Sequence, residues 1–352
     1  MTGPGPTAGP GRADAEPRGT LVDRFGRAHH DLRISLTDRC SLRCTYCMPA
    51  EGVPWLARST MLSTDEIVRV AAVGVDLGIR EIRLTGGEPL LRVDVVDVVR
   101  RLTALTTPDG APVEVSLTTN ALRLPALAAP LRDAGLQRVN ISLDTLDRAR
   151  FAELTRRDRL VETLAGIAAA DAAGLHPVKI NAVAMRGVND DEVVALTRFA
   201  VERGYQMRFI EQMPLDGGHT WDRTAMVTQA EILERLTAAF TLTEVPGRGA
   251  APAELWYVDG GPATVGVIAS VSAPFCGACD RLRLTADGQL RACLFSQAEV
   301  DTREILRTSP DADVAEGLAD AYRRCLAGKK AGHGIDDPTF LQPRRPMSAI
   351  GG

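Results

Sequence analysis

The sequence predicts an α/β fold: a parallel sheet covered by helices, followed by a smaller α+β region. Between residues 30 and 215, six short apolar or β-branched runs alternate with amphipathic stretches of helical length. This alternation is typical of β–α units, whose crossovers are right-handed and place helices over the sheet. After about residue 220 the pattern changes to one helical stretch, then to short strands interrupted by glycine and proline. The six units fit either an open or partial (βα) barrel or a doubly wound sheet.

The six expected strands are short apolar or β-branched runs bounded by turn residues. In chain order they cover residues 32–36, 81–85, 113–119, 138–143, 178–183 and 206–213. In both candidate folds the chemistry belongs at the carboxyl ends of these strands.

Capping patterns mark the helices between these strands. The first helix is expected to begin after Ser63, because a serine followed by Glu66 resembles a capping box. Others are expected to begin near Asp94 and near residues 189–192, and further helical stretches cover 229–239 and 314–326. Four glycines stand where helices should end, as C′ glycines do: Gly78, Gly135, Gly174 and Gly204.

The composition argues against several classes of protein. The 352 residues carry 41 basic and 45 acidic side chains, so a net charge of −4 argues against a generally basic protein that coats nucleic acid. A membrane span is not expected, since no run of about 18 apolar residues occurs. Seven cysteines without a secretory signal pattern predict the reducing cytosol. Residues 1–20, rich in glycine and proline, are expected to be disordered.

The first of two cysteine triplets directly follows the first expected strand. Cys40, Cys44 and Cys47 have the spacing C-x3-C-x2-C. Three thiolates this close can wrap one compact inorganic cluster, and a 4Fe-4S cube held by three cysteines keeps one iron without a protein ligand. An open coordination position is typical of a catalytic metal site. The alternative is a zinc knuckle that recruits a fourth ligand from elsewhere.

The second triplet lies in the C-terminal region and consists of Cys276, Cys279 and Cys293. Alone it could hold zinc, but beside the first triplet a second open cluster is favoured. The seventh cysteine, Cys325, lies in an expected helix, so we predict a buried thiol there.

These motifs together resemble the radical S-adenosylmethionine (SAM) superfamily and, within it, the GTP 3′,8-cyclase family. Tyr46 stands directly before the third cysteine of the first triplet, and a Gly-Gly-Glu motif at 86–88 follows the second expected strand. An Asp-Arg-Leu-Arg stretch at 280–283 inside the second triplet and a terminal Gly-Gly narrow the resemblance. It covers residues 32–352.

The resemblance implies a fold and a division of the chain. The fold is a partial (βα)6 radical SAM barrel followed by a smaller C-terminal α+β region that carries a second Fe–S cluster. The implied divisions are a disordered leader at 1–20, the barrel at 21–220, the domain with the auxiliary cluster at 221–331, and a tail at 332–352 that ends in Gly-Gly.

Two 4Fe-4S clusters and S-adenosyl-L-methionine are the cofactors that the resemblance implies. The six cysteines of the triplets would be the metal ligands. Gly86, Gly87 and Glu88 would receive the amino end of SAM, because glycines allow close approach of the backbone and a carboxylate pairs with an ammonium. Side chains at strand ends would line the adenosyl pocket: Tyr46, Ser142 and Met213.

Substrate binding is expected to depend on basic side chains that lie far apart in the sequence. The chain has no G-x-x-x-x-G-K-[ST] motif, and a triphosphate held otherwise needs several Arg or Lys side chains that converge from different strands. Lys179 is notable because the chain has three lysines against 38 arginines. The resemblance adds Thr118, with Thr119 as the adjacent alternative. The cationic candidates are Arg33, Arg83, Lys179, Arg281 and Arg283.

The resemblance also implies that the C-terminal tail enters the active site. Gly351 and Gly352 lack side chains, so they can thread a narrow pocket and bring a carboxylate to arginines. The catalytic group expected in this way is Arg33, Arg83, Arg283, Gly351 and Gly352.

The implied activity is that of a lyase that converts GTP to (8S)-3′,8-cyclo-7,8-dihydroguanosine 5′-triphosphate, the first step of molybdenum cofactor (molybdopterin) biosynthesis. The implied partners are an electron donor such as flavodoxin or ferredoxin, and cyclic pyranopterin monophosphate synthase as acceptor of the product. We expect a cytoplasmic monomer or homodimer with no nucleic-acid or membrane partner.

Two other functions fit parts of the sequence. One is a radical SAM maturase that modifies peptides and carries an auxiliary cluster, although such enzymes usually have more C-terminal cysteines. The other is a non-catalytic Fe–S or zinc protein, against which the open position in each triplet argues.

Overall fold

The computed structural model describes residues 19–351 apart from 217 and 219. The expected leader therefore lies outside the described residues, except for positions 19 and 20. No helix in the described part of the chain is long and apolar enough to cross a membrane.

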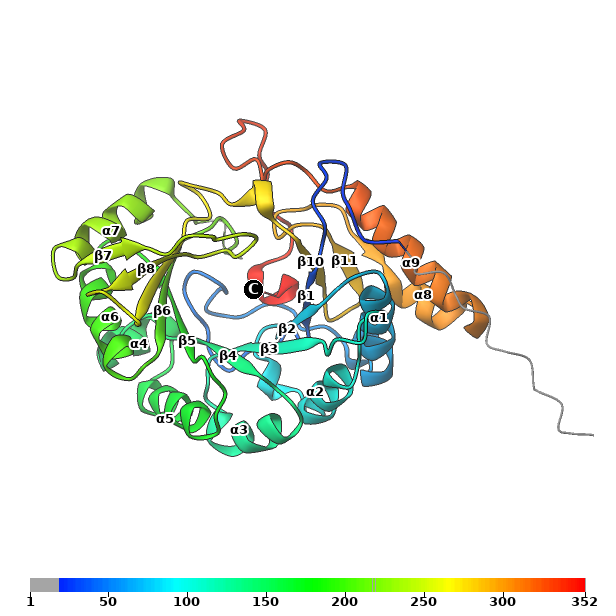
Figure 1. Cartoon of the computed structure of the whole chain (residues 1–352), viewed down its shortest axis with the longest axis horizontal. Coiled ribbons are helices and arrows are strands. Elements are labelled where there is room, and N and C mark those ends of the chain that lie inside the picture. Colours follow the sequence, from blue (N-terminus) through cyan, green and yellow to red (C-terminus); the bar gives the residue numbers. More distant parts are fainter. Residues whose placement is uncertain (1–18, 217, 219, 352) are drawn as a thin grey trace, which may run out of the picture.

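A twelve-stranded sheet forms a partial barrel, in the order β12-β11-β10-β1-β2-β3-β4-β5-β6-β9-β8-β7. Figure 1 shows the central strands arranged in a curve, with helices on the outside. The strands are β1 (Asp31–Ser35), β2 (Glu81–Thr85), β3 (Glu114–Thr119), β4 (Arg138–Ser142), β5 (Lys179–Ala184), β6 (Gln206–Glu211), β7 (Leu242–Glu244), β8 (Glu254–Val258), β9 (Thr264–Ile268), β10 (Arg281–Leu284), β11 (Gln289–Arg291) and β12 (Val300–Asp301).

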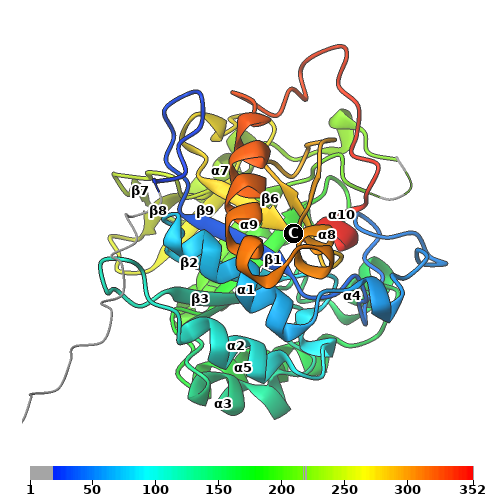
Figure 2. The ribbon, with the colours of Figure 1, turned by 90° about the vertical axis from the view of Figure 1, so that its right-hand side faces the viewer.

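The helices cover the outer face of this sheet and its C-terminal extension. They are α1 (Thr64–Asp76), α2 (Val95–Thr103), α3 (Leu124–Asp133), α4 (Arg148–Thr155), α5 (Leu160–Ala172), α6 (Val193–Glu202), α7 (Gln229–Thr237), α8 (Thr302–Thr308), α9 (Asp311–Ala327) and α10 (Met347–Ile350). Figure 2 shows α9 on the outside of the barrel beside α1, where the Tyr322 hydroxyl donates to the Val70 carbonyl oxygen at 3.1 Å.

The six strands expected from the sequence are confirmed. The expected bounds of 81–85 match β2, and the others differ from the observed bounds by one or two residues at an end. Strand β6 ends at Glu211, so that Met213 lies in the loop after it. Strands β1 to β6 are parallel and neighbour one another in chain order. A doubly wound sheet would reverse its strand order at a switch point, so that alternative is wrong and the partial barrel is confirmed.

The C-terminal strands extend both edges of the barrel sheet. Strand β9 pairs in parallel with β6, and β10 pairs in parallel with β1, so that Arg283 lies opposite Arg33. The second cysteine triplet is thereby brought to the edge next to the first strand. The domain boundary expected near residue 220 stays a prediction.

The expected helix signals are present in the structure. The Ser63 hydroxyl accepts from the Glu66 amide and the Glu66 carboxylate accepts from the Ser63 amide, which is a complete capping box. The four expected helix-ending glycines all have positive φ angles, between 71° and 106°. Cys325 is a buried thiol in α9, as the sequence predicted.

Candidate functional site

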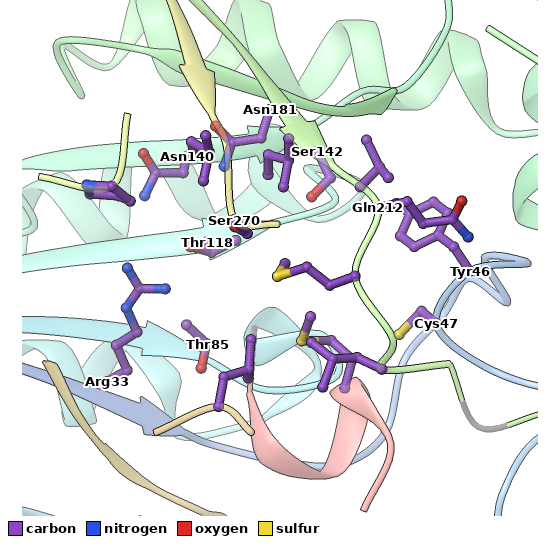
Figure 3. Close-up of a pocket in the computed structure, with 18 of the residues that line it drawn as sticks. Arg33, Tyr46, Cys47, Thr85, Thr118, Asn140, Ser142, Asn181, Gln212 and Ser270 are labelled. Atoms are coloured by element: carbon purple, nitrogen blue, oxygen red, sulfur yellow. The ribbon is translucent and has the colours of Figure 1, made fainter. Parts of the chain in front are cut away.

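The barrel encloses a pocket of about 330 Å³ that is lined by β1 to β6 and by β10. All six cysteines of the two triplets are among its lining residues. Figure 3 shows Tyr46, Cys47 and Gln212 at one end of this pocket, and Arg33 at the other. The residues that resemble a SAM site and those that resemble a substrate site therefore share one cavity.

Alternation along each strand makes the inside of the barrel polar. On β2, Ile82 and Leu84 are fully buried in the core. Arg83 and Thr85, which point to the opposite side, line the pocket. Because strand side chains alternate between two faces, the same arrangement repeats around the barrel. The interior differs from an apolar, packed barrel core and is suited to a polar ligand.

Positive charge accumulates in this interior. Five arginines line the pocket: Arg33, Arg83, Arg208, Arg281 and Arg283. Burial, reinforced by the neighbouring arginines, lowers the pKa of Arg33 well below its usual range and that of Arg208 to about 9. The nearest ion pair of Arg33 is loose, with Nε 3.8 Å from the Asp31 carboxylate. An anion bound here would relieve this repulsion.

The Gly-Gly-Glu motif is joined to the loop that leads into the first triplet. The amide of Gly87 donates to the Thr37 carbonyl oxygen at 2.7 Å, and the amide of Glu88 donates to the Arg39 carbonyl oxygen at 2.7 Å. A Cβ on Gly87 would overlap the Arg39 carbonyl oxygen. Glycine is required because the two backbones lie closer together than any side chain permits.

Glu88 is buried beneath this loop and holds the end of β3. Its carboxylate accepts from the Thr119 hydroxyl at 2.7 Å, the Asn120 amide at 2.7 Å and the Leu90 amide at 3.0 Å. Burial raises the pKa of Glu88 to about 7. A carboxylate has about four acceptor positions, so about one is left for a ligand ammonium.

We predict that Gly87→Ala disrupts the first cluster. The new Cβ would meet two backbone carbonyl groups, so the loop that carries Cys40 must move. The expected result is a loss of the iron that the first triplet binds. Iron content after anaerobic reconstitution measures it. The control is Gly332→Ala, which places a Cβ in open space; an iron content equal to that of the parent in Gly87→Ala would contradict the prediction.

Tyr46 closes the pocket beside the first triplet. Its hydroxyl donates to Asp144 at 2.8 Å, and the Val183 amide donates to the other oxygen of that carboxylate at 2.8 Å. Burial raises the pKa of Asp144 to about 6. Ser142 at the end of β4 and Met213 in the loop after β6 line the same cavity.

All three cysteines of the first triplet line the pocket and are partly buried. Burial raises the pKa of Cys40 to about 11 and that of Cys47 to about 12. Burial also raises the pKa of Cys44, and the charges of Asp144, Cys47 and Cys40 raise it further, so these groups are electrostatic neighbours. Thiolates gathered in this way need a cationic partner, which iron supplies. The residues therefore fit a 4Fe-4S cluster.

The second triplet faces the cavity from the C-terminal strands. A helical turn (Cys276–Ala278) carries its first cysteine, and Cys293 follows β11. Although burial opposes it, Arg281 and Lys329 lower the pKa of Cys279. Three neighbouring cysteines, one with cations that favour its thiolate, also fit an Fe–S cluster.

The C-terminal tail lies inside the barrel. Figure 1 shows α10, in red, at the centre of the ring of strands. The Gly351 carbonyl oxygen accepts a hydrogen bond from the Arg283 guanidinium. A Cβ on Gly351 would lie 2.5 Å from the Thr85 hydroxyl oxygen, so the tail fits tightly. Gly352 lies outside the described residues.

Most of the residues expected from the sequence line one cavity. They are the six triplet cysteines with Arg33, Tyr46, Arg83, Gly86, Gly87, Glu88, Thr118, Ser142, Met213, Arg281 and Arg283. Thr119 also lines it, but its hydroxyl is engaged by Glu88, and its amide neighbour Asn120 is held by the same carboxylate. Thr118 is therefore the threonine that remains available to a ligand.

Lys179 lies deeper than the sequence suggested. It is at the start of β5, two residues before Asn181, and is not part of the described lining of the pocket. Burial first, and then Arg208, Arg138 and Arg83, lower its pKa to about 7. The lysine thus belongs to the cationic interior below the pocket, and its contact with a substrate stays a prediction.

Several polar lining residues were missed by sequence reasoning. Arg208, Asn140, Asn181 and Ser270 all line the pocket. Arg208 could have been found from period-two alternation, because it stands between the buried Met207 and Phe209. Ser270 follows β9, and no local sequence pattern predicts that β9 pairs with β6.

Comparison with known families agrees with this geometry. Residues 34–200 match the family model described as the radical SAM superfamily, and residues 205–335 match that described as Molybdenum Cofactor Synthesis C. The first match includes the first triplet and the Gly-Gly-Glu motif, and the second includes the second triplet. A SAM site and one 4Fe-4S cluster are thereby assigned to the barrel.

Curated relatives decide the family. A protein of Streptomyces coelicolor named GTP 3′,8-cyclase is 56% identical over 344 residues, which cover 97% of this chain and 98% of that protein. The chain belongs to the GTP 3′,8-cyclase family. A member from Corynebacterium glutamicum is 55% identical over 94% of this chain and 89% of its own. One from Mycobacterium tuberculosis, named GTP 3′,8-cyclase 2, is 53% identical over 96% and 95%.

Solved structures share the fold at low sequence identity. Streptococcus suis SuiB bound to the precursor peptide SuiA has a TM-score of 0.60 and 14% identity, covering 93% of this chain and 77% of that one. Native anSMEcpe with bound AdoMet has a TM-score of 0.53 and 11% identity, covering 83% of this chain and 82% of that one. These likenesses support the radical SAM barrel and carry no information about the substrate of this family member.

Proposed function

We propose that this chain is a radical SAM lyase that converts GTP to (8S)-3′,8-cyclo-7,8-dihydroguanosine 5′-triphosphate, the first step of molybdenum cofactor biosynthesis. The observation that carries the proposal is the cationic interior of the barrel, which opens into the cavity shared by both cysteine triplets. A triphosphate is the kind of ligand that such a group of arginines binds, and curated family members are named for action on GTP.

The barrel mouth would hold SAM. When bound, the first cluster and SAM together supply a 5′-deoxyadenosyl radical. Gly86 and Gly87 present backbone without side chains, and Glu88 has about one acceptor position left for the amino group. Tyr46, held by Asp144, would lie against the adenosyl moiety together with Ser142 and Met213. The enclosed cavity limits access of water to the reacting groups.

The arginines would hold the triphosphate below that mouth. Arg33, Arg83 and Arg208 come from three parallel strands, so their guanidinium groups approach one ligand from different sides. Arg281 and Arg283 come from β10, directly after Cys279. A nucleotide bound between them would have its phosphates on the arginines and its base near the second triplet, with Thr118 as a neutral contact. Such positioning orients the ribose toward the SAM end of the cavity.

The second triplet would hold a second 4Fe-4S cluster. Cys276, Cys279 and Cys293 line the cavity without a fourth cysteine beside them in the sequence, which leaves one iron for the guanine. This arrangement supports the proposal that one cluster binds SAM and the other binds the purine.

The partners are part of the same proposal. Reductive use of SAM needs an electron, for which a small carrier such as flavodoxin or ferredoxin is suited. The product would pass to cyclic pyranopterin monophosphate synthase. A cytoplasmic location accounts for the free cysteines, since thiols persist in a reducing compartment. The oligomeric state in this proposal is a monomer or a homodimer.

A peptide-modifying radical SAM maturase is the second candidate, and the fold shared with SuiB is compatible with it. The cavity argues against it, because five lining arginines would repel basic peptides and leave unpaired cations beside neutral ones. The 53–56% identity to curated cyclases also outweighs a structural likeness at 14%.

Anaerobic reconstitution tests the proposal directly. We expect about eight irons per chain, since each cube contains four, and reductive SAM cleavage that yields a cyclised nucleotide only with GTP. Cleavage stimulated by a peptide and not by GTP would indicate the maturase. Zinc without iron would indicate a non-catalytic protein.

Lys179→Ala is predicted to weaken GTP binding by about tenfold, since one charge-assisted hydrogen bond contributes about 1.5–3 kcal/mol. The pKa of Lys179 is lowered to about 7 in the free protein, and a phosphate would favour the charged ammonium. Binding must therefore take up a proton above pH 7, and affinity must fall as pH rises. This pH dependence should be weaker in Lys179→Ala than in the parent, by calorimetry at pH 6.5 and 8.5. Equal affinity and equal pH dependence would remove Lys179 from the substrate site.

A further inference from the structure

A second cavity of about 380 Å³ lies against the second triplet. It is lined by Cys276, Cys279 and Cys293, which also line the main pocket, and by Lys329. The triplet thus separates the substrate cavity from a C-terminal one. Among the residues that line this cavity, Lys329 donates a hydrogen bond to the Cys279 sulfur.

Lys329 is held rigidly just after α9. Its ammonium donates to the Arg281 carbonyl oxygen at 2.7 Å and to the Cys279 sulfur at 3.7 Å. The residue is 3% exposed. A buried cation that has one carbonyl oxygen and one sulfur as its partners is directed at the triplet, since an ammonium without an anionic partner is costly to bury.

The backbone around Lys329 is braced by a third segment. The Arg27 guanidinium donates to the Cys276 carbonyl oxygen at 2.5 Å and to the Lys330 carbonyl oxygen at 2.8 Å. Arg27 also pairs with the buried carboxylate of Asp23 at 2.6 Å. Figure 1 shows residues 21–30, in dark blue, on the same side as the end of α9. Because Arg27 bonds both the triplet backbone and the backbone next to Lys329, it fixes the position of Lys329 relative to the triplet.

We propose that Lys329 is a positioning residue that hydrogen-bonds the Cys279 thiolate and raises the reduction potential of the second cluster. The inference rests on the proposed second cluster. Hydrogen bonds to the sulfurs and the local net charge are two of the factors that set the potential of an Fe–S cluster. Reduction adds negative charge, so a buried cation near a ligating sulfur stabilises the reduced form more than the oxidised one.

The chain itself provides a matched control. Lys330 is the next residue, carries the same charge and is exposed, and its charge lowers the pKa of Asp337. Replacing either lysine with methionine removes one positive charge and keeps a similar chain length. Only Lys329→Met removes the contact with sulfur.

The test uses the full chain with Cys40, Cys44 and Cys47 replaced by alanine, so that only the second triplet can hold a cluster. The solution is held at the midpoint potential of the second cluster in this three-alanine protein. EPR spectroscopy then measures the ratio of reduced to oxidised cluster in each variant. We expect Lys329→Met to lower that ratio by about tenfold, which corresponds to 59 mV for one electron. Lys330→Met should leave it unchanged, and Lys329→Arg, which keeps the charge, should restore most of it.

The outcomes separate this inference from the function on which it rests. If the three-alanine protein binds no iron–sulfur cluster, the proposed second cluster and this inference both fail. If it holds a cluster whose ratio is the same in Lys329→Met and in the parent, the inference alone is overturned. Should Lys329→Met lose its iron, Lys329→Gln replaces it, and an unchanged ratio there overturns the inference equally.

Discussion

Replacing Cys40 with serine is expected to lower reductive SAM cleavage by at least about a thousandfold, because an interaction on which the chemistry depends is removed. Cys40 is one of three thiols that reach the first cluster site, where its sulfur accepts from the Leu42 amide at 3.4 Å. Two remaining cysteines leave two irons of a cube without protein ligands. A serine hydroxyl stays protonated far above the pH at which a thiol ionises, so it does not replace the thiolate.

The measurement is 5′-deoxyadenosine formed under a chemical reductant, together with iron content. If the proposed second cluster is present, iron should fall by about half, because only the cube at the first triplet is lost. Cys325→Ser is the matched control, because Cys325 is buried in α9 and lines neither the main pocket nor the second cavity. SAM cleavage at the parent rate in Cys40→Ser would show that the first triplet is not the SAM-binding cluster.

The barrel itself could be predicted because its signals are local. Each strand is a short apolar run, and α1 begins at a capping box on Ser63, so the six β–α units could be predicted from the order of residues. The first triplet was equally visible, since its ligands lie within eight positions of one another. Local spacing therefore sufficed for the part of the site made by a single loop.

The closing strands could not be predicted in the same way. Strand β10 pairs with β1 across about 250 residues of chain, and β9 pairs with β6 although β7 and β8 lie between them in the sequence. Pairing over such distances depends on which sheet edge is free, and no sequence period records it. The opposition of Arg33 and Arg283, and hence the link between tail and cluster, emerges only from the folded sheet.

The position of a side chain along the barrel axis also could not be predicted from the sequence. Lys179 was singled out for being a lysine in an arginine-rich chain, whereas Arg208 was passed over. In the structure Arg208 lines the pocket and Lys179 lies below it on the neighbouring strand. Both alternate with apolar neighbours, so periodicity places both inside the barrel, but the level along its axis depends on strand stagger, which composition does not reveal.

Deleting Gly351 and Gly352 is expected to lower GTP turnover by at least about a hundredfold while leaving iron content and SAM binding at parent values. The tail is seated firmly: Ile350 is buried, and the Met347 amide donates to the Leu215 carbonyl oxygen at 3.2 Å. Arg345 anchors the preceding segment through Asp287 at 2.9 Å. Removing two glycines would keep these anchors and withdraw only the part of the tail that reaches Arg283.

Two point variants distinguish the effect of a side chain inside the barrel from the effect of backbone strain at a glycine. Gly351 and Gly334 both have positive φ angles, 86° and 76°, so alanine is disfavoured at both. At Gly334 a Cβ meets open space, whereas at Gly351 it would lie 2.5 Å from the Thr85 hydroxyl. We therefore expect Gly351→Ala to lose turnover and Gly334→Ala to keep it. Full turnover in the deletion variant would mean that Arg283 needs no acceptor from the tail, and the arginines alone would then have to orient the nucleotide.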